Sequence, residues 1–268
     1  MSETMLNLVI ILLGTLVETS LCVDVPFMEC RQKQLDKLNE KNSDGHTSLY
    51  LAARDGHIGR VKELLDCGAD LTVKDNDGNT ALLIASGWGR LDVVKLLISR
   101  GAPLNDQDNE GYTALHSAIM ARHAGLVKEL LDHGANIAAK NKRGWTPLML
   151  ASNGLCLDAV KLLISRGAPI SDKDDIGETA LHKAAFYGVV SVMKDLLDHG
   201  ANLTAKDNYG DTPLMIASKS QYSKLDAVKY LVDRGAPVND RNNYCETALR
   251  HAHGDKENYL KSKGGIAC

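Results

Sequence analysis

The side chains best suited to chemistry are scattered along this chain of 268 residues. Of its nine histidines, only His251 and His253 lie two residues apart. Two histidines are too few for a structural metal site, which takes four ligands. We therefore expect no metal there.

Aspartates gather in two places, Asp75 with Asp77 and Asp174 with Asp175. A calcium loop needs ligands at alternating positions and a terminal glutamate, which neither cluster has. Asp side chains in such short polar stretches bond their own backbone, so we expect them to form turns.

No known combination of catalytic residues occurs in the sequence. It contains no glycine-rich phosphate loop followed by Lys-Ser/Thr, no Gly-x-Ser-x-Gly and no His-Glu-x-x-His. No nucleophile, base and orienting group stand out as a set. The sequence therefore predicts a protein that is not an enzyme and uses no cofactor, metal or small-molecule substrate.

Charge and composition narrow the class of partner. Lys plus Arg number 31 and Asp plus Glu number 34, so the formal net charge is −3. That balance argues against a nucleic-acid binder, which carries a basic excess. Aromatic residues make up only 4%, so the core must be built from Leu, Ile, Val and Ala.

A repeat of 33 residues organises the chain. A Gly-x-Thr triplet begins at Gly45, Gly78, Gly111, Gly144, Gly177 and Gly210. A seventh copy, at 245–247, has lost its glycine, and two residues inserted between Ser218 and Leu225 lengthen the last step to 35.

Each unit contains the signals for two helices. The Thr is placed to cap the first helix, and Pro147 and Pro213 follow two of these threonines, where a missing N–H costs nothing. A stripe such as Val61, Leu64 and Leu65 gives the second helix one buried face. The glycine of a closing Gly-Ala pair supplies a left-handed C-terminal cap. Each unit therefore predicts a turn, a short helix, a tight link, a longer helix and a loop.

These motifs resemble the ankyrin repeat family over about residues 42–253. The fullest matches are the Thr-Ala-Leu-His stretches Thr113–His116 and Thr179–His182, with Asp55-Gly56-His57 in agreement. The resemblance implies an all-α ankyrin-repeat solenoid of stacked helix-turn-helix units with short β-hairpin turns between repeats. It also implies that His116 and His182 form hydrogen bonds between repeats and have no catalytic role.

The expected organisation has four parts. They are an apolar signal-like segment at 1–22, an N-terminal cap helix at 23–41 with Leu35 and Leu38 facing inward, six repeats at 42–242, and a degenerate C-terminal capping repeat with an abbreviated second helix at 243–268. A longer period is nested within the repeats. Leu91–Pro103 and Leu157–Pro169 are almost identical, which indicates a duplicated block of 66 residues.

The amino terminus and the cysteines point to different compartments. Thr4–Val17 carries no charge, and its 14 residues would span roughly 21 Å as a helix, shorter than a bilayer core. That length matches a secretory signal, although Glu3, Glu18 and the lack of an early Lys or Arg favour a packed extension instead. Secretory entry is slightly favoured, with a cytoplasmic protein as the alternative.

Cys67, Cys156 and Cys245 fall in repeats one, four and seven, about 30 Å apart by helix diameters. They are too far apart to pair with one another, and such use of cysteine is typical of the cytoplasm. Cys245 could instead pair with Cys268 at the carboxyl end.

Family resemblance places the variable contact positions four, three and one before each Thr and seven and eight after it. Seven of the 12 aromatic residues fall there, where each one either anchors a partner or packs on the next repeat. With basic and Met neighbours, the candidate contact residues are Arg54, Trp88, Tyr112, Met120, Arg122, Lys142, Arg143, Trp145, Phe186, Tyr187, Tyr209, Lys219 and Tyr244.

Lys142, Arg143 and Trp145 in one turn are the strongest single group and would suit an acidic partner, unless they form a solvated tip. We therefore expect a monomeric, non-enzymatic scaffold or adaptor that binds a partner protein through its concave surface. The alternatives are a regulatory or inhibitory subunit of an enzyme and a secreted effector acting on an extracellular or host target.

Overall fold

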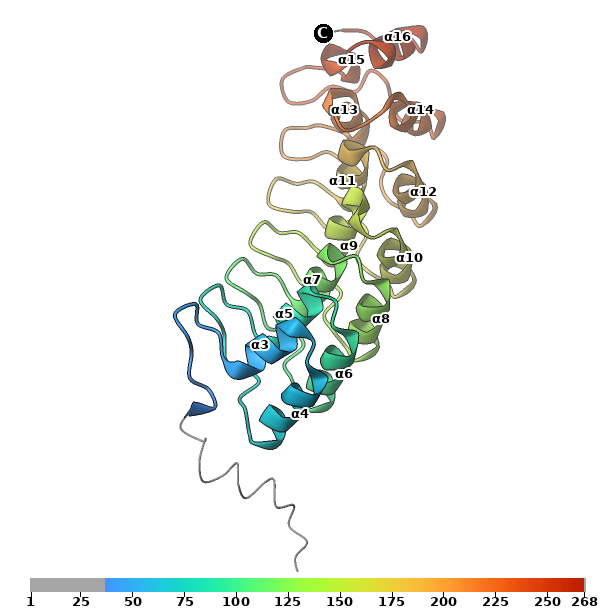
Figure 1. The fold of residues 1–268 in the computed structure, drawn as a ribbon. Coiled ribbons are helices and arrows are strands. Elements are labelled where there is room, and N and C mark those ends of the chain that lie inside the picture. Colours follow the sequence, from blue (N-terminus) through green and yellow to red (C-terminus); the bar gives the residue numbers. More distant parts are fainter. Residues whose placement is uncertain (1–36, 268) are drawn as a thin grey trace, which may run out of the picture.

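A computed structural model describes residues 37–267 of the chain as a curved stack of helix pairs (Figure 1). The first helix of each pair lies in an inner row: α3 (Ser48–Asp55), α5 (Ala81–Gly87), α7 (Ala114–Met120), α9 (Pro147–Leu150), α11 (Ala180–Tyr187), α13 (Pro213–Lys219) and α15 (Ala248–His251). The second lies in an outer row: α4 (Ile58–Asp66), α6 (Leu91–Ser99), α8 (Ala124–Asp132), α10 (Leu157–Ser165), α12 (Val190–Asp198), α14 (Leu225–Asp233) and α16 (Asp255–Ser262).

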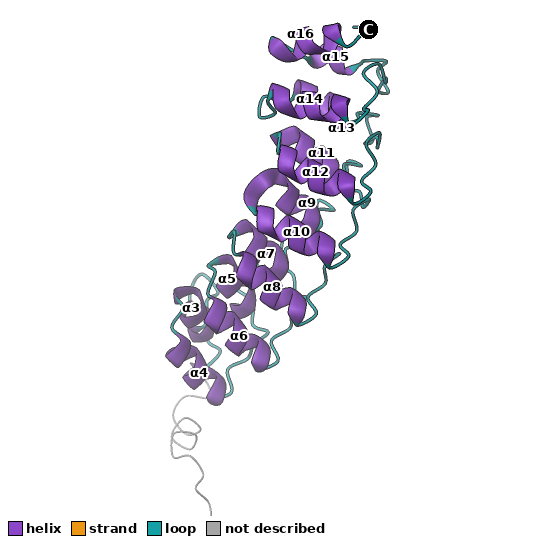
Figure 2. Cartoon of the chain, turned by 90° about the vertical axis from the view of Figure 1, so that its right-hand side faces the viewer, coloured by secondary structure: helices purple, strands orange, loops and turns teal. Residues whose placement is uncertain are grey.

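The two rows form separate layers (Figure 1), with the loops between repeats along one edge (Figure 2). The inner helices and these loops line the concave side of the stack (Figure 1). The structure thus confirms the predicted all-α solenoid. No described residue lies in a strand, so the expected β-hairpins are reduced to their turns.

Threonine caps start the inner helices, as the sequence predicts. Thr47 Oγ1 accepts the Tyr50 N–H at 3.1 Å, and the other repeats before the last use their threonines in the same way. In α7 the Thr113 N–H also donates to His116 Nδ1, which completes a capping box. These bonds satisfy amide groups that have no partner inside the helix.

Aliphatic side chains form one continuous core between the rows. Leu115, Val127 and Leu163 are fully buried, and Leu181 is almost so. The turns are closed by their aspartates, because Asp75 Oδ1 accepts the N–H groups of Asp77 and Asn79. Asp174 makes the same bonds, which confirms the turn-forming role.

The nested 66-residue period has a structural counterpart on the outer row. An arginine at the end of every second outer helix pairs with an aspartate of the repeat before it. These pairs are Arg100–Asp66 at 2.8 Å, Arg166–Asp132 at 2.6 Å and Arg234–Asp198 at 2.9 Å. The duplicated block is therefore a clamped pair of repeats.

Repeat four departs from the pattern. Its inner helix α9 ends after four residues and continues as a π-helical turn, η2 (Ala151–Leu155). The glycine that ends the inner helix, Gly154, comes eight residues after Thr146, whereas Gly56 and Gly188 come nine after theirs. In repeat three the equivalent position is Arg122, which has a φ of 61°.

The two ends of the stack differ from the expectation. Residues 37–39 form a short turn with Leu38 buried, in place of the end of the predicted cap helix. The rest of that helix, before residue 37, and the apolar segment lie outside the described residues. In repeat seven the inner helix α15 is the shortened one, not the second helix, because α16 runs for eight residues. Lys256 Nζ donates to the carbonyl oxygens of Ala217 and Ser220, which fixes α16 against α13.

The cysteines correct one expectation. Cys156 and Cys245 are free, so Cys245 does not pair with Cys268; the tail is held instead by the Thr247 hydroxyl, which donates to the Ile266 carbonyl. Cys67 is in a disulfide. The three repeat cysteines do not pair with one another, as the sequence predicts.

Candidate partner-binding surface

The contact residues predicted from sequence fall into two rows on the inner side. The tip row lies in the turns before the inner helices and includes Tyr112, Lys142, Arg143, Trp145, Tyr209 and Tyr244. The helix-end row lies at the carboxyl ends of the inner helices and includes Arg54, Trp88, Met120, Arg122, Phe186, Tyr187 and Lys219.

Burial divides the aromatic residues into two groups. Trp88, Tyr187, Tyr209 and Tyr244 are exposed, with 56% of Trp88 and 67% of Tyr244 accessible. Tyr112, Trp145 and Phe186 are half-buried and pack against the core. The first group is free to contact a partner, whereas the second contributes to the packing of the core.

Trp145 is held by a buried ion cluster. Lys183, only 5% exposed, sits with its Nζ 2.7 Å from the Asp174 carboxylate and also pairs with Glu178. The same ammonium lies 4.5 Å from the centroid of the Trp145 ring. The sequence search missed Lys183 because it lies between the contact positions taken from the family.

The basic residues of the two rows differ in their pairing. Arg54 pairs with Asp55 at 2.8 Å, and Lys219 pairs with Asp211. Arg122, Lys142 and Arg143 are exposed and form no ion pair within 37–267. Their charges remain available to another molecule.

An exposed aromatic cluster extends the helix-end row in repeats five and six. The Phe186 ring lies 5.0 Å from that of Tyr187 and 5.5 Å from that of Tyr222, centroid to centroid. Tyr222 is exposed, but it belongs to the two-residue insertion of repeat six. Counting positions from the threonines therefore passed over it.

Two ladders of hydrogen bonds fix the turns to one another. In repeats two to six, a long side chain six residues before the Thr donates to the equivalent backbone carbonyl of the next repeat. These side chains are Lys74, Gln107, Lys140, Lys173 and Lys206. A second ladder runs the other way from the amides of Asn76, Asn109, Asn208 and Asn243. Lys142 and Asp175 occupy the asparagine position in repeats four and five and make no such bond there.

The buried histidines have a structural role. His116 Nε2 lies 3.2 Å from the Trp145 carbonyl oxygen, and His182 makes the same bond to Asp211 in the next repeat. Desolvation lowers the pKa of His116 from 6.5 to about 4 and lowers that of His182 as well. Both rings are therefore neutral near pH 7, and neither reaches the surface.

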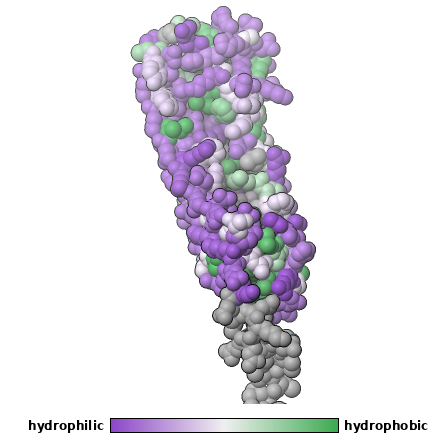
Figure 3. Space-filling model, turned by 60° about the vertical axis from the view of Figure 1, so that its left-hand side comes forward, coloured by the Kyte–Doolittle hydropathy of each residue, from purple (hydrophilic) through white to green (hydrophobic). Residues whose placement is uncertain are grey.

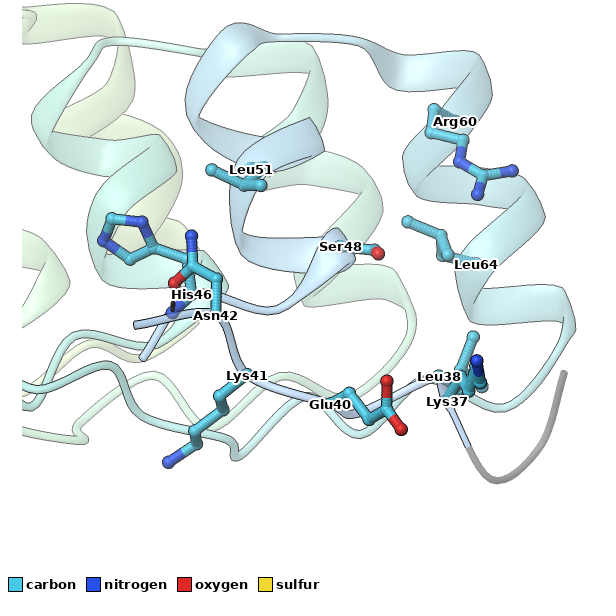
Figure 4. Close-up of a pocket in the computed structure, with 10 residues that line it drawn as sticks. All are labelled: Lys37, Leu38, Glu40, Lys41, Asn42, His46, Ser48, Leu51, Arg60 and Leu64. Atoms are coloured by element: carbon cyan, nitrogen blue, oxygen red, sulfur yellow. Dashed lines mark hydrogen bonds between the residues drawn. The ribbon is translucent and has the colours of Figure 1, made fainter. Parts of the chain in front are cut away.

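A hollow of about 410 Å³ lies at the amino-terminal end of the stack (Figure 4). Leu38, Leu51 and Leu64 are its apolar lining residues, and Lys37, Lys41 and Arg60 are among the charged ones. None of the predicted contact residues lines it. Within residues 37–267 no cluster of His, Cys, Asp or Glu could hold a metal ion, and no helix is long and apolar enough to cross a membrane.

Comparisons with known proteins agree with this architecture. The family profile described as ankyrin repeats matches residues 7–108, 100–174 and 156–242. The human ASB11 ankyrin repeat domain superposes with a TM-score of 0.74 at 25% identity, over 83% of this chain and all of that one. The ankyrin repeat domain of Bcl-3, a member of the IkappaB family, gives 0.71 at 31% identity, over 82% of this chain and all of that one. No curated protein sequence matches the chain significantly.

Proposed function

Because the chain belongs to the ankyrin repeat family, we propose that it is a monomeric, non-enzymatic scaffold that binds a partner protein on the tip row and the helix-end row. A rigid solenoid suits this task, since it presents a long surface at little entropic cost on binding. The exposed aromatic residues supply the anchors that dominate protein interfaces.

The exposed aromatic residues and the unpaired cations of the inner side together carry the proposal. Outer-row arginines are paired across repeats, as in Arg100–Asp66 and Arg166–Asp132. On the inner side Arg122, Lys142 and Arg143 have no such partner among the described residues. Unpaired cations on the same side as exposed aromatic residues fit a partner that offers carboxylates and apolar side chains.

Affinity capture with the full chain tests this proposal. We expect the double reversal Lys142→Glu/Arg143→Glu to weaken retention of the partner and to reduce its sensitivity to salt. Lys161→Glu/Lys194→Glu is a matched control, because both of these lysines are exposed on outer helices and the change in net charge is the same.

A partner retained equally by the wild type and the tip variant, but lost by the outer-helix variant, would overturn the proposal. Circular dichroism of each variant checks that the fold is unchanged.

A further inference from the structure

The residue at the apex of each turn, three before the Thr, changes its chemistry along the stack. It is acidic in the first three repeats (Asp44, Asp77, Glu110), basic in the fourth (Arg143) and apolar in the last three (Ile176, Tyr209, Tyr244). All seven are exposed. Ile176 was not among the residues chosen from sequence, because that choice weighed aromatic and basic side chains.

The last three apices expose apolar surface that the fold does not use. The exposed fraction is 43% for Ile176, 48% for Tyr209 and 67% for Tyr244. The mostly hydrophilic face in Figure 3 is broken by green patches, including in its upper part, where the carboxyl-terminal repeats lie. Three large apolar side chains at successive turns are more than the single scattered residues of an ordinary surface.

These apices are held in fixed register. The Asn208 N–H donates to the Ile176 carbonyl and the Asn243 N–H donates to the Tyr209 carbonyl, each at 2.9 Å. The asparagine side chains bond the same neighbouring turns. The row is therefore a preorganised surface, whose spacing is set by the packing of the helices behind it.

That spacing indicates the conformation of an occupant. Neighbouring packed helices lie about 8–10 Å apart, so successive apices recur at about that interval. A polyproline II helix has three residues per turn and rises about 3.1 Å per residue, so every third side chain faces one way at intervals of about 9 Å. In a β-strand, residues three apart face opposite sides.

We propose that the turn apices bind an extended, polyproline II segment of the partner, in which every third residue contacts one apex. The segment offers apolar side chains to Ile176, Tyr209 and Tyr244, a carboxylate to Arg143, and basic side chains to the acidic turns beyond it. Charge complementarity along the row sets the register, and the proposal rests on the protein-binding function proposed above.

Fluorescence anisotropy with synthetic peptides tests this. The probe is a run of x-Pro-Pro triplets in which x is Lys, Lys, Glu, Leu, Leu and Leu in turn, made in both chain directions. We expect the full chain to bind one direction, and a peptide of the same composition with its leucines two residues apart to bind about tenfold more weakly.

Variants of the chain test the contacts. Ile176→Ser/Tyr209→Ser should weaken binding about tenfold. Ile58→Ser/Leu157→Ser, which changes exposed apolar residues of the outer helices α4 and α10, should leave it unchanged. Arg143→Glu should weaken binding, and replacing the peptide's Glu with Lys should restore it. Failure of both directions to bind, or equal binding of the misspaced peptide, would overturn the proposal.

The capture experiment separates this inference from the proposed function. A captured partner that depends on Lys142 and Arg143 but tolerates Ile176→Ser/Tyr209→Ser would leave the scaffold function standing and remove the apolar register. If capture of the partner depended on no residue of the inner side, both the proposed scaffold function and the polyproline II proposal would be overturned.

Discussion

The roles of some single residues could be predicted from the sequence, whereas the roles of others could not. The threonine caps and the structural histidines could be predicted because each depends on local spacing. Lys183, Ile176 and Tyr222 were missed for different reasons. Lys183 is buried by contacts from other turns, Ile176 is not aromatic, and Tyr222 lies in an insertion that shifts the register.

At this scale the buried histidines predict a dependence on pH. The folded chain keeps His116 neutral, with its pKa lowered to about 4, whereas the unfolded chain protonates it near 6.5. The contribution of neutral His116 to the free energy of unfolding is therefore fully present above about pH 6.5. It is lost as the pH falls toward 4, which lowers the free energy of unfolding by up to about 3 kcal/mol.

His116→Met should flatten this dependence in urea titrations at pH 7 and pH 5. Met149 and Met215 occupy the same position in other repeats, so the site tolerates methionine. His253→Met, at an exposed residue, should leave the pH dependence unchanged. If the stability of His116→Met still fell between pH 7 and pH 5 as steeply as that of the wild type, His116 would not be the source of the pH dependence.

At Arg122 we expect a substitution to change stability and partner binding in opposite directions. Its φ of 61° lies in the left-handed region that glycine occupies in neighbouring repeats. Arg122→Gly should stabilise the chain by about 1 kcal/mol in denaturant titration while weakening capture of the partner. Ala121→Gly is the control, since Ala121 has a φ of −73° and should lose stability. Destabilisation by Arg122→Gly would show that the backbone there is not strained.

Among the helices, hydrophobic periodicity predicted almost every element, because the signals that form each helix lie within its own stretch of sequence. The π-helical turn of repeat four was missed, since it depends on a glycine moved by only one position. The arginine clamps on the outer row were also missed, although the 66-residue period that encodes them was visible. Pairing between repeats needs the register of the stack, which a single helix does not supply.

The same scale predicts how truncations of the core differ along the stack. Leu181→Ala, between two neighbouring repeats, should cost about 2–5 kcal/mol. Leu249→Ala, in the last repeat, should cost less because neighbours pack on one side only. Urea titration measures both. A loss below about 0.5 kcal/mol for Leu181→Ala would contradict its place in the core.

For the whole molecule, the solenoid follows from the sequence, whereas the division of its surface required the structure. The sequence placed the aromatic residues on the inner side, but only burial separates Trp88, Tyr209 and Tyr244 from the half-buried Tyr112, Trp145 and Phe186. Only the ion pairs show that Arg100, Arg166 and Arg234 are paired across repeats on the outer row, whereas Arg122, Lys142 and Arg143 on the inner side pair with no described residue. The candidate surface is the side that combines these unpaired cations with exposed aromatic residues.

Site-specific photo-crosslinking tests this most directly. A photoreactive phenylalanine replaces Tyr209 on the tip row in one variant and Tyr230 on outer helix α14 in the other, so both changes start from a tyrosine. Irradiation of the full chain in its native cells should yield a protein adduct from position 209 and none from position 230. Adducts from position 230 alone would contradict binding through the inner side.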